Sequence, residues 1–231
     1  MKSKAVIIPA AGSGTRLGSD VPKAFIEVSG KTILQRSIEC FLNIDGMMQI
    51  IIPAPKNYIS TCKRICSELE SRSVSLEVVE GGAERQYSIW NGIKVLNSGV
   101  ELVAVHDAAR PFVKEEFIVS CFKTADEFGG AVLGIPVKDT IKEVKENLEV
   151  KNTPERSSLW QAQTPQVFTK DLIVDAYRSA LEEEFLGTDD ASLVERIDGK
   201  VKMVMGDSEN LKITYPVDLK MAEIIAEGWN E

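Results

Sequence analysis

The sequence of 231 residues is poor in the residues that build metal centres and disulfide frameworks. It contains one histidine, His106, and four cysteines, and no Cys-x2-Cys pair occurs. Four cysteines in a chain of this length do not form the dense pattern of a disulfide-stapled secreted domain. With a single histidine they also cannot complete a zinc site. Cys62 and Cys66 lie one helical turn apart, and we expect them to be core and edge residues of a helix.

Long apolar runs and an excess of basic charge are also missing from the sequence. No run approaches the roughly 18 apolar residues that a membrane-spanning helix needs, and the apolar stretch before Gly12 is too short for a secretory signal. Lysine and arginine number 27 against 35 acidic residues, for a net charge of -8, which argues against a non-specific nucleic-acid binder. The 44% apolar content is that of an ordinary folded protein. We therefore expect a cytoplasmic protein without nucleic-acid or membrane partners.

Short apolar runs alternate with helical patterns along the chain. The runs are Ala5–Ile8, Met48–Ile52, Leu76–Val79, Leu102–Val105 and Ala131–Ile135. Their near-continuous apolar character is typical of strands that are covered on both faces. Between them, apolar residues recur at helical spacing. This alternation predicts an α/β fold, with a mostly parallel, open twisted sheet and helices on both faces.

The same signals continue to the end of the chain. They predict a helix from about Lys170 to Glu183, a capped helix that starts at Thr188-Asp189-Asp190, and a final helix after Pro216. Two more strands are predicted, at Val201–Met205 and at Leu211–Thr214. No repeat or linker divides the sequence, so we expect residues 1–231 to form one domain.

One segment interrupts the alternation of strands and helices. Thr140–Lys151 consists of two alternating polar and apolar runs around Glu146-Asn147, which predicts a β-hairpin with its turn near Asn147. The segment is charged and contains few apolar residues, so it cannot form a core. The residues alone leave two interpretations open: an arm over about 138–156 that reaches a partner, or an ordinary solvated hairpin.

A glycine-rich loop follows the first predicted strand. It reads Ala10-Ala11-Gly12-Ser13-Gly14-Thr15-Arg16-Leu17-Gly18, and Pro22-Lys23 comes after it. Backbone amides in such a loop can approach phosphate oxygens closely. The dinucleotide fingerprint needs a glycine where Leu17 stands, and the loop has no Gly-Lys-Ser/Thr triplet of the phosphate-loop NTPases. Arg16 and Lys23 instead indicate two permanent cations for a triphosphate at the carboxyl edge of the sheet. The alternative is a surface turn with solvated basic side chains.

The pattern Ala-Ala-Gly-x-Gly-x-Arg-x-Gly-x3-Pro-Lys resembles the nucleotide-binding signature of the nucleotidyltransferase superfamily. Over nearly its whole length the chain is similar to the 2-C-methyl-D-erythritol 4-phosphate cytidylyltransferases. Further blocks stand in the family's order, and they are Gly81–Ser88, Val105–Pro111, Pro136–Lys142, Gln163–Phe168, Thr188–Asp190 and Asn210–Thr214. The family usually has glutamine after the loop lysine, whereas this chain has Ala24.

The resemblance implies transfer of CMP from CTP to a phosphorylated polyol, 2-C-methyl-D-erythritol 4-phosphate, with release of pyrophosphate. It implies direct in-line attack of an acceptor phosphate oxygen on the α-phosphorus, without a covalent enzyme intermediate. In agreement, the sequence has no Gly-x-Ser-x-Gly nucleophile elbow. The resemblance also implies a homodimer through the arm, in which Arg156 completes the neighbour's site.

The resemblance and the positions of the residues together give a set of expected site residues. For the nucleotide they are Ala10, Ala11, Gly12, Ser13, Gly14, Gly82, Arg85, Ser88 and Asp107. For the acceptor they are Asp107, Ala108, Arg110, Thr140, Arg156, Thr164, Thr188 and Lys212. The expected catalytic cations are Arg16, Lys23, Arg156 and Lys212. Asp107 is the expected Mg²⁺ ligand, because a carboxylate at the end of a strand can face the triphosphate.

Several of these residues could instead have a purely structural role. Asp107 could be a turn aspartate, Ser88 a capping residue and Lys212 a solvated strand lysine. His106 is expected to be structural rather than a general base. Rival functions are a ribitol 5-phosphate cytidylyltransferase, a sugar-1-phosphate nucleotidylyltransferase and an NAD-dependent oxidoreductase. Val105–Pro111 with Asp139–Lys142 favours the erythritol acceptor, and Leu17 disfavours the oxidoreductase.

Overall fold

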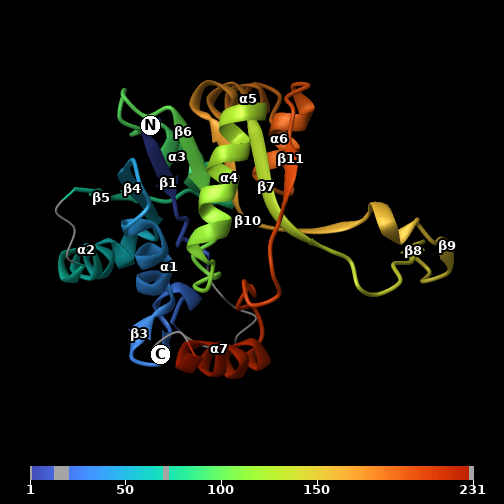
Figure 1. Ribbon diagram of the computed structural model, residues 1–231, viewed down its shortest axis with the longest axis horizontal. Helices are drawn as coiled ribbons and strands as arrows, with labels where there is room; N and C mark the ends of the chain where they lie inside the picture. Colours follow the sequence, from blue (N-terminus) through green and yellow to red (C-terminus); the bar gives the residue numbers. More distant parts are fainter. Residues whose placement is uncertain (1, 13–20, 70–72, 229–231) are drawn as a thin grey trace.

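Seven strands form the central sheet of the computed structural model, which describes residues 2–12, 21–69 and 73–228. Their order is β11-β7-β10-β6-β1-β4-β5 (Figure 1). The bounds are β1 (Lys4–Ile7), β4 (Met47–Ala54), β5 (Ser75–Glu80), β6 (Leu102–Val105), β7 (Gly130–Pro136), β10 (Trp160–Thr169) and β11 (Lys202–Met205). β1 runs parallel to β4 and β6, β4 to β5, and β7 to β11, while β10 is antiparallel to both of its neighbours. The predicted mostly parallel sheet is therefore confirmed.

Helices cover both faces of this sheet, as predicted. Because successive side chains of a strand point to opposite faces, Val6 of β1 packs in one core cluster and Ile7 in the other. The first cluster includes buried residues of α1 (Ile33–Leu42), α2 (Ile59–Glu68) and α4 (Glu115–Phe128). The second includes residues of α3 (Arg85–Ile93), α5 (Lys170–Glu182) and α6 (Asp190–Arg196). Cys62 is buried in the first cluster and Cys66 packs at its margin, as expected for one helix.

A third, smaller cluster holds the C-terminal helix α7 (Pro216–Gly228) against the body. Ala222 and Ala226 of α7 pack there with Val28 of β2 (Glu27–Val28) and with Ile213. β2 pairs with β3 (Lys31–Thr32) in a separate two-stranded sheet. This packing fixes the segment between β11 and α7, which carries Lys212. Among the described helices, none is both long and apolar enough to cross a membrane.

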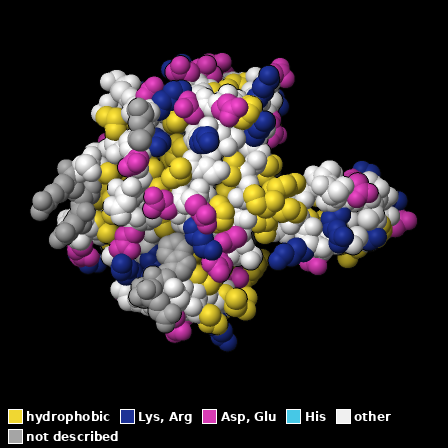
Figure 2. All heavy atoms as spheres, viewed as in Figure 1, with side chains coloured by type: hydrophobic (Ala, Val, Ile, Leu, Met, Phe, Trp, Pro, Cys, Tyr) yellow, Lys and Arg dark blue, Asp and Glu magenta, His cyan; other side chains and the backbone are white. Residues whose placement is uncertain are grey.

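The predicted hairpin protrudes from the body as an arm (Figure 1). β8 (Glu143–Val144) and β9 (Val150–Asn152) pair antiparallel, and the turn between them has Leu148 at φ 66. Figure 2 shows acidic and basic side chains on the arm among other side chains, and Leu148 at its tip is 80% exposed. The arm thus contributes almost nothing to the core of its own chain.

The fold differs from the sequence-based expectations at β10 and in the segment before α7, and the β2–β3 pair was not predicted either. β10 was not predicted, because Pro165 and three glutamines obscure the strand pattern in residues 160–169. The structure accommodates Pro165 where the register between β10 and β7 shifts, between Ala162 and Gln166. The predicted strand at Leu211–Thr214 is wrong: these residues form an irregular segment, whose backbone is tied to the body by Ile213 N donating to Ala109 O.

Candidate active site

The carboxyl ends of the parallel strands β1, β4, β5 and β6 meet at one edge of the sheet, where open α/β sheets bind their ligands. A cavity of about 380 Å³ opens there. It brings together ten of the predicted site residues, namely Ala10, Ala11, Gly12, Lys23, Gly82, Arg85, Ser88, Asp107, Ala108 and Lys212. We call it the nucleotide cavity. Ser13, Gly14 and Arg16 lie outside the described residues.

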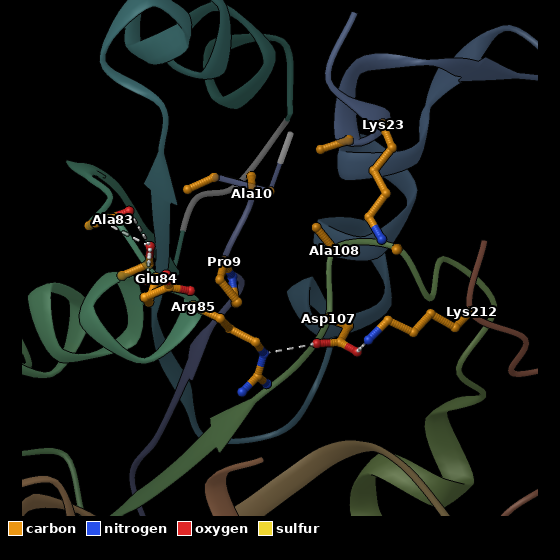
Figure 3. A pocket seen from close by; sticks show the side chains of 15 residues that line it. Pro9, Ala10, Lys23, Ala83, Glu84, Arg85, Asp107, Ala108 and Lys212 are labelled. Carbon is orange, nitrogen blue, oxygen red and sulfur yellow. Dashed lines mark hydrogen bonds and ion pairs between the residues drawn. The ribbon is translucent and has the colours of Figure 1, made fainter. Parts of the chain in front are cut away.

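Asp107 is the electrostatic centre of this cavity. Its Oδ2 lies 2.8 Å from Lys212 Nζ and 3.8 Å from Arg110 Nε, and its Oδ1 lies 3.3 Å from Arg85 Nε. Figure 3 shows the carboxylate between Arg85 and Lys212. Burial alone disfavours the charged form, but Arg85, Lys212 and Arg110 outweigh it and hold the pKa of Asp107 well below its usual range. Three cationic side chains therefore surround the ionised carboxylate of Asp107.

One wall of the cavity is formed by Gly82 and the start of α3. Gly82 N donates to Ser88 Oγ at 3.0 Å, and Ser88 Oγ donates to Glu84 O at 3.1 Å. A Cβ on Gly82 would lie 2.4 Å from Tyr87 Cβ and 2.9 Å from its carbonyl carbon, so only glycine fits this turn. The Ser88 hydroxyl thus ties Gly82 to α3. The N-cap of α3 is Glu84, so the capping role considered for Ser88 is wrong, and Ser88 lines the cavity.

Two further cavities adjoin the nucleotide cavity. One of about 440 Å³ is lined by Arg110, Lys138, Asp139, Asn210 and Lys212, among others. A smaller one of about 180 Å³ is lined by Arg85, Asp107, Arg110, Thr164, Thr188 and Lys212, among others. Lys212 lines all three cavities, and Arg110 lines the two that lie outside the nucleotide cavity. The predicted acceptor residues of the body therefore lie beside the predicted nucleotide residues, as a reaction between two bound molecules requires.

His106 and Thr164 hold the Asp107 segment in place. His106 is fully buried, with Nε2 2.9 Å from Arg110 O and Nδ1 3.1 Å from Thr164 Oγ1. Because a carbonyl can only accept, Nε2 carries the proton and Nδ1 accepts from the threonine hydroxyl. The same hydroxyl accepts from Asp107 N at 3.0 Å. The Thr164 hydroxyl thus donates its proton to His106 and is not free to donate to a ligand. This arrangement agrees with the structural role expected for His106.

The arm residues stand apart from these cavities. Arg156, in the short 3-10 helix Arg156–Ser158, is exposed and donates from Nη1 to Lys138 O at 3.0 Å. Thr140 is exposed as well. Neither residue lines any of the three cavities described above. Within one chain, the structure does not bring Arg156 and Thr140 together with Lys212.

Ala24, which takes the place of the usual glutamine, lines the nucleotide cavity. It lies in the 3-10 helix Lys23–Phe25, is 2% exposed and packs in the first core cluster.

A Gly-Lys-Thr triplet also occurs outside the glycine-rich loop, at Gly30–Thr32. Gly30 turns the β2–β3 hairpin with φ 77, and Thr32 caps α1. The triplet therefore has a structural role and does not line the nucleotide cavity.

The fit of a divalent cation depends on how many oxygen ligands the protein offers. The described residues contain no group of three or more His, Cys, Asp or Glu side chains that could hold a metal ion. Among the described residues, Asp107 is the one buried carboxylate that lines the nucleotide cavity, and it is held ionised. Mg²⁺ prefers oxygen ligands and is commonly held by one or two carboxylates together with substrate phosphates. The residues thus fit a cation that is bound mainly by a triphosphate, with Asp107 as its protein ligand.

The sequence does not predict that two core residues, Tyr177 and Asp190, are linked to the site through Arg85. The predicted capped helix start is confirmed, with Asp189 as the N-cap of α6 and Asp190 in its first turn. Asp190 itself is 0% exposed and accepts from Arg85 Nη2 at 2.8 Å and from Tyr177 Oη at 2.5 Å. Nothing local in the sequence signals these contacts, because they join α3, α5 and α6 across the second core cluster.

Comparison with known proteins gives one family for nearly the whole chain. Residues 4–228 match the family described as 2-C-methyl-D-erythritol 4-phosphate cytidylyltransferase. A protein of that name from Caldanaerobacter subterraneus subsp. tengcongensis is 46% identical over 224 residues, which cover 97% of this chain and 98% of the relative. One from Clostridioides difficile is 44% identical over 223 residues, 95% of this chain and 92% of the relative. The crystal structure of 4-diphosphocytidyl-2C-methyl-D-erythritol synthase from Anaerococcus prevotii is similar with a TM-score of 0.87 and 32% identity, covering 98% of this chain and 96% of that one.

Proposed function

The chain belongs to the 2-C-methyl-D-erythritol 4-phosphate cytidylyltransferase family, and from this premise we propose how its own residues carry out the reaction. The enzyme is a nucleotidyltransferase that transfers CMP from CTP to 2-C-methyl-D-erythritol 4-phosphate, releases pyrophosphate and forms CDP-methylerythritol for isoprenoid biosynthesis. The ribitol phosphate and oxidoreductase alternatives have no such support from the family match.

One observation carries the proposed mechanism: Lys212 lines the nucleotide cavity and both adjoining cavities. A cation in that position can contact the triphosphate on one side and the acceptor phosphate on the other. An acceptor phosphate oxygen forms a bond to the α-phosphorus while the bond to the β-phosphate breaks, and pyrophosphate leaves in line. The enzyme has to bring two anions together, so its main contribution is positioning and charge neutralisation.

The residues divide this work between them. Arg16 and Lys23 bind the triphosphate, Gly82, Arg85 and Ser88 shape the wall beside the nucleoside, and Arg110 with Lys212 draws in the acceptor phosphate. A Mg²⁺ ion on the triphosphate would neutralise part of its charge, with Asp107 as the protein ligand. The cations around Asp107 support this assignment in the otherwise acidic protein, because they keep its carboxylate ionised.

We include a homodimer in the proposal, with the arm over about 138–156 reaching a second copy. Two observations support it. The arm carries exposed apolar side chains at Ile141, Val144, Leu148 and Val150, and Thr140 and Arg156 do not line the cavities of their own chain. In a dimer these two residues would bind the acceptor phosphate at the partner's site, where an arginine can make a bidentate contact. A cytoplasmic location, in line with the free cysteines, belongs to the same proposal.

The test is an assay of pyrophosphate release by the purified protein with CTP and Mg²⁺. We expect turnover with 2-C-methyl-D-erythritol 4-phosphate and little with ribitol 5-phosphate. ATP, GTP and UTP serve as controls for the nucleotide. Turnover with ribitol 5-phosphate alone would overturn the acceptor assignment, and the absence of any CTP-dependent turnover would overturn the activity.

A further inference from the structure

A row of alternating charges leads from the protein core to the nucleotide cavity. Tyr177 Oη donates to Asp190 Oδ1 at 2.5 Å, and Asp190 Oδ2 accepts from Arg85 Nη2 at 2.8 Å. Arg85 Nε in turn donates to Asp107 Oδ1 at 3.3 Å. Arg85 and Asp107 line the nucleotide cavity, whereas Tyr177 and Asp190 line none of the three cavities of the site. The inner half of the row is therefore out of reach of substrate.

Burial makes this arrangement costly unless every charge is paired. Asp190 is 0% exposed and Tyr177 1%, whereas the Arg85 side chain is 36% exposed toward the cavity. Burial disfavours the Arg85 cation, but Asp190 and Asp107 outweigh it and raise the pKa of Arg85. A buried ion pair of this kind adds little net stability compared with apolar residues of the same size. What it does provide is a fixed direction for a planar guanidinium that is bonded through two of its nitrogens.

The residues that hold Arg85 are themselves held firmly. The Tyr177 ring lies parallel to Trp90 of α3, with ring centroids 6.3 Å apart and an interplanar angle of 5°. Gln86, the neighbour of Arg85, donates to Phe185 O and accepts from Gly187 N. The ring contact joins α3 to α5, and Gln86 joins the start of α3 to the loop between α5 and α6. The backbone of Arg85, at the first residue of α3, is therefore held in place by contacts of the helix with its neighbours.

We infer that Tyr177 and Asp190 are positioning residues that orient Arg85, and through it Asp107, for nucleotide binding. The inference rests on the proposed function, in which Arg85 and Asp107 bind the nucleotide. Without the Tyr177 hydroxyl, Asp190 loses one of its two fixed bonds and can rotate. The Arg85 guanidinium then loses its preferred orientation. Nucleotide binding has to order this side chain, and the entropy lost in doing so weakens binding.

The first experiment measures the dissociation constant of CTP by calorimetry, with Mg²⁺ and without acceptor. Tyr177→Phe removes only the hydroxyl, and we expect it to weaken CTP binding about threefold to tenfold, the effect of one hydrogen bond. Asp190→Asn removes the charge that pairs with Arg85, and we expect a larger loss. Tyr215→Phe, on an exposed ring outside the cavities, is the matched control and should bind CTP like the wild type. Unchanged CTP binding in folded Tyr177→Phe and Asp190→Asn would overturn the inference.

The second experiment separates positioning from a merely structural role. If Tyr177 acts through Arg85, then Tyr177→Phe should cause no further loss of CTP affinity in an Arg85→Ala background. A structural role would give the same loss in both backgrounds and would overturn the inference. Because Arg85→Ala leaves Asp190 buried with one partner fewer, Arg85→Lys is the second background in case the first does not fold. Wild-type protein that fails to bind CTP at all would contradict the proposed function, which distinguishes the two failures.

Discussion

Lys212 Nζ lies 2.8 Å from Asp107 Oδ2, although the two residues come from different structural units. Asp107 follows the central strand β6, whereas Lys212 lies in the irregular segment between β11 and α7. The hydrogen bond from Ile213 N to Ala109 O and the burial of Ile213 hold that segment against the loop after β6. The packing of α7 thereby places the Lys212 ammonium group where the three cavities of the site meet.

The first prediction concerns this lysine. Its side chain is 41% exposed, so Lys212→Ala should leave the fold intact. We expect kcat/KM to fall about 100-fold or more, because a charge that stabilises the transferring phosphoryl group is lost. The measurement is the steady-state rate with CTP and acceptor, together with a thermal unfolding curve. Lys220→Ala, on the exposed side of α7, is the control; equal activity of both variants would remove Lys212 from the site.

The second prediction concerns the hydroxyl that supports Asp107. Thr164→Val keeps the shape of the side chain but leaves the buried Asp107 N–H and His106 Nδ1 without their partner. We expect the free energy of unfolding to drop by about 1–3 kcal/mol, the cost of an unsatisfied buried group. Thr164→Ser retains the hydroxyl and should lose clearly less. Urea unfolding of the two variants decides the matter, and it goes against this interpretation if serine destabilises the protein as much as valine.

The third prediction is a pH dependence of stability. Burial lowers the pKa of His106 to about 4, below the value of about 6.5 for an exposed histidine. Between these values the unfolded chain binds a proton that the folded protein does not, so stability decreases as the pH falls through this window. From pH 7 to pH 5 the histidine should account for about 2 kcal/mol of lost stability. His106→Gln lacks this contribution, so its free energy of unfolding should fall by less over the same interval; parallel pH profiles would contradict the prediction.

The architecture and the glycine-rich loop could be predicted because their signals are local, whereas most of the other expected site residues rest on the family resemblance. Apolar runs indicate strands that are buried on both faces. The glycine-rich stretch and the basic residues that follow it indicate a ligand-binding loop at the end of a strand. β10 was missed because its polar residues and Pro165 hide the pattern, although Thr164 on that strand had been assigned to the site. The role of Asp190 had no local signal, because its partners Arg85 and Tyr177 lie far away in the chain and meet it only in the folded core.

The last prediction tests whether two chains share a site. Arg16 and Arg156 are both expected to be essential, and Arg156 lies on the arm, away from the cavities of its own chain. If the arm serves the partner, a mixed dimer of Arg16→Ala and Arg156→Ala chains contains one site with both arginines and one with neither. Random exchange of equal amounts makes half of the dimers mixed, so activity should recover to about a quarter of the wild-type value.

The rescue experiment requires proof that subunits exchange. Differently tagged chains are mixed, the doubly tagged dimer is purified, and its rate of CMP transfer is compared with that of each parent. A mixture of Arg16→Ala with Lys212→Ala chains is the matched control. Both of these residues belong to the body of one chain, so in a mixed dimer each site still lacks one cation and no activity should return. Recovery in the first mixture alone assigns Arg156 to the neighbour's site, whereas an inactive, verified mixed dimer assigns it to its own.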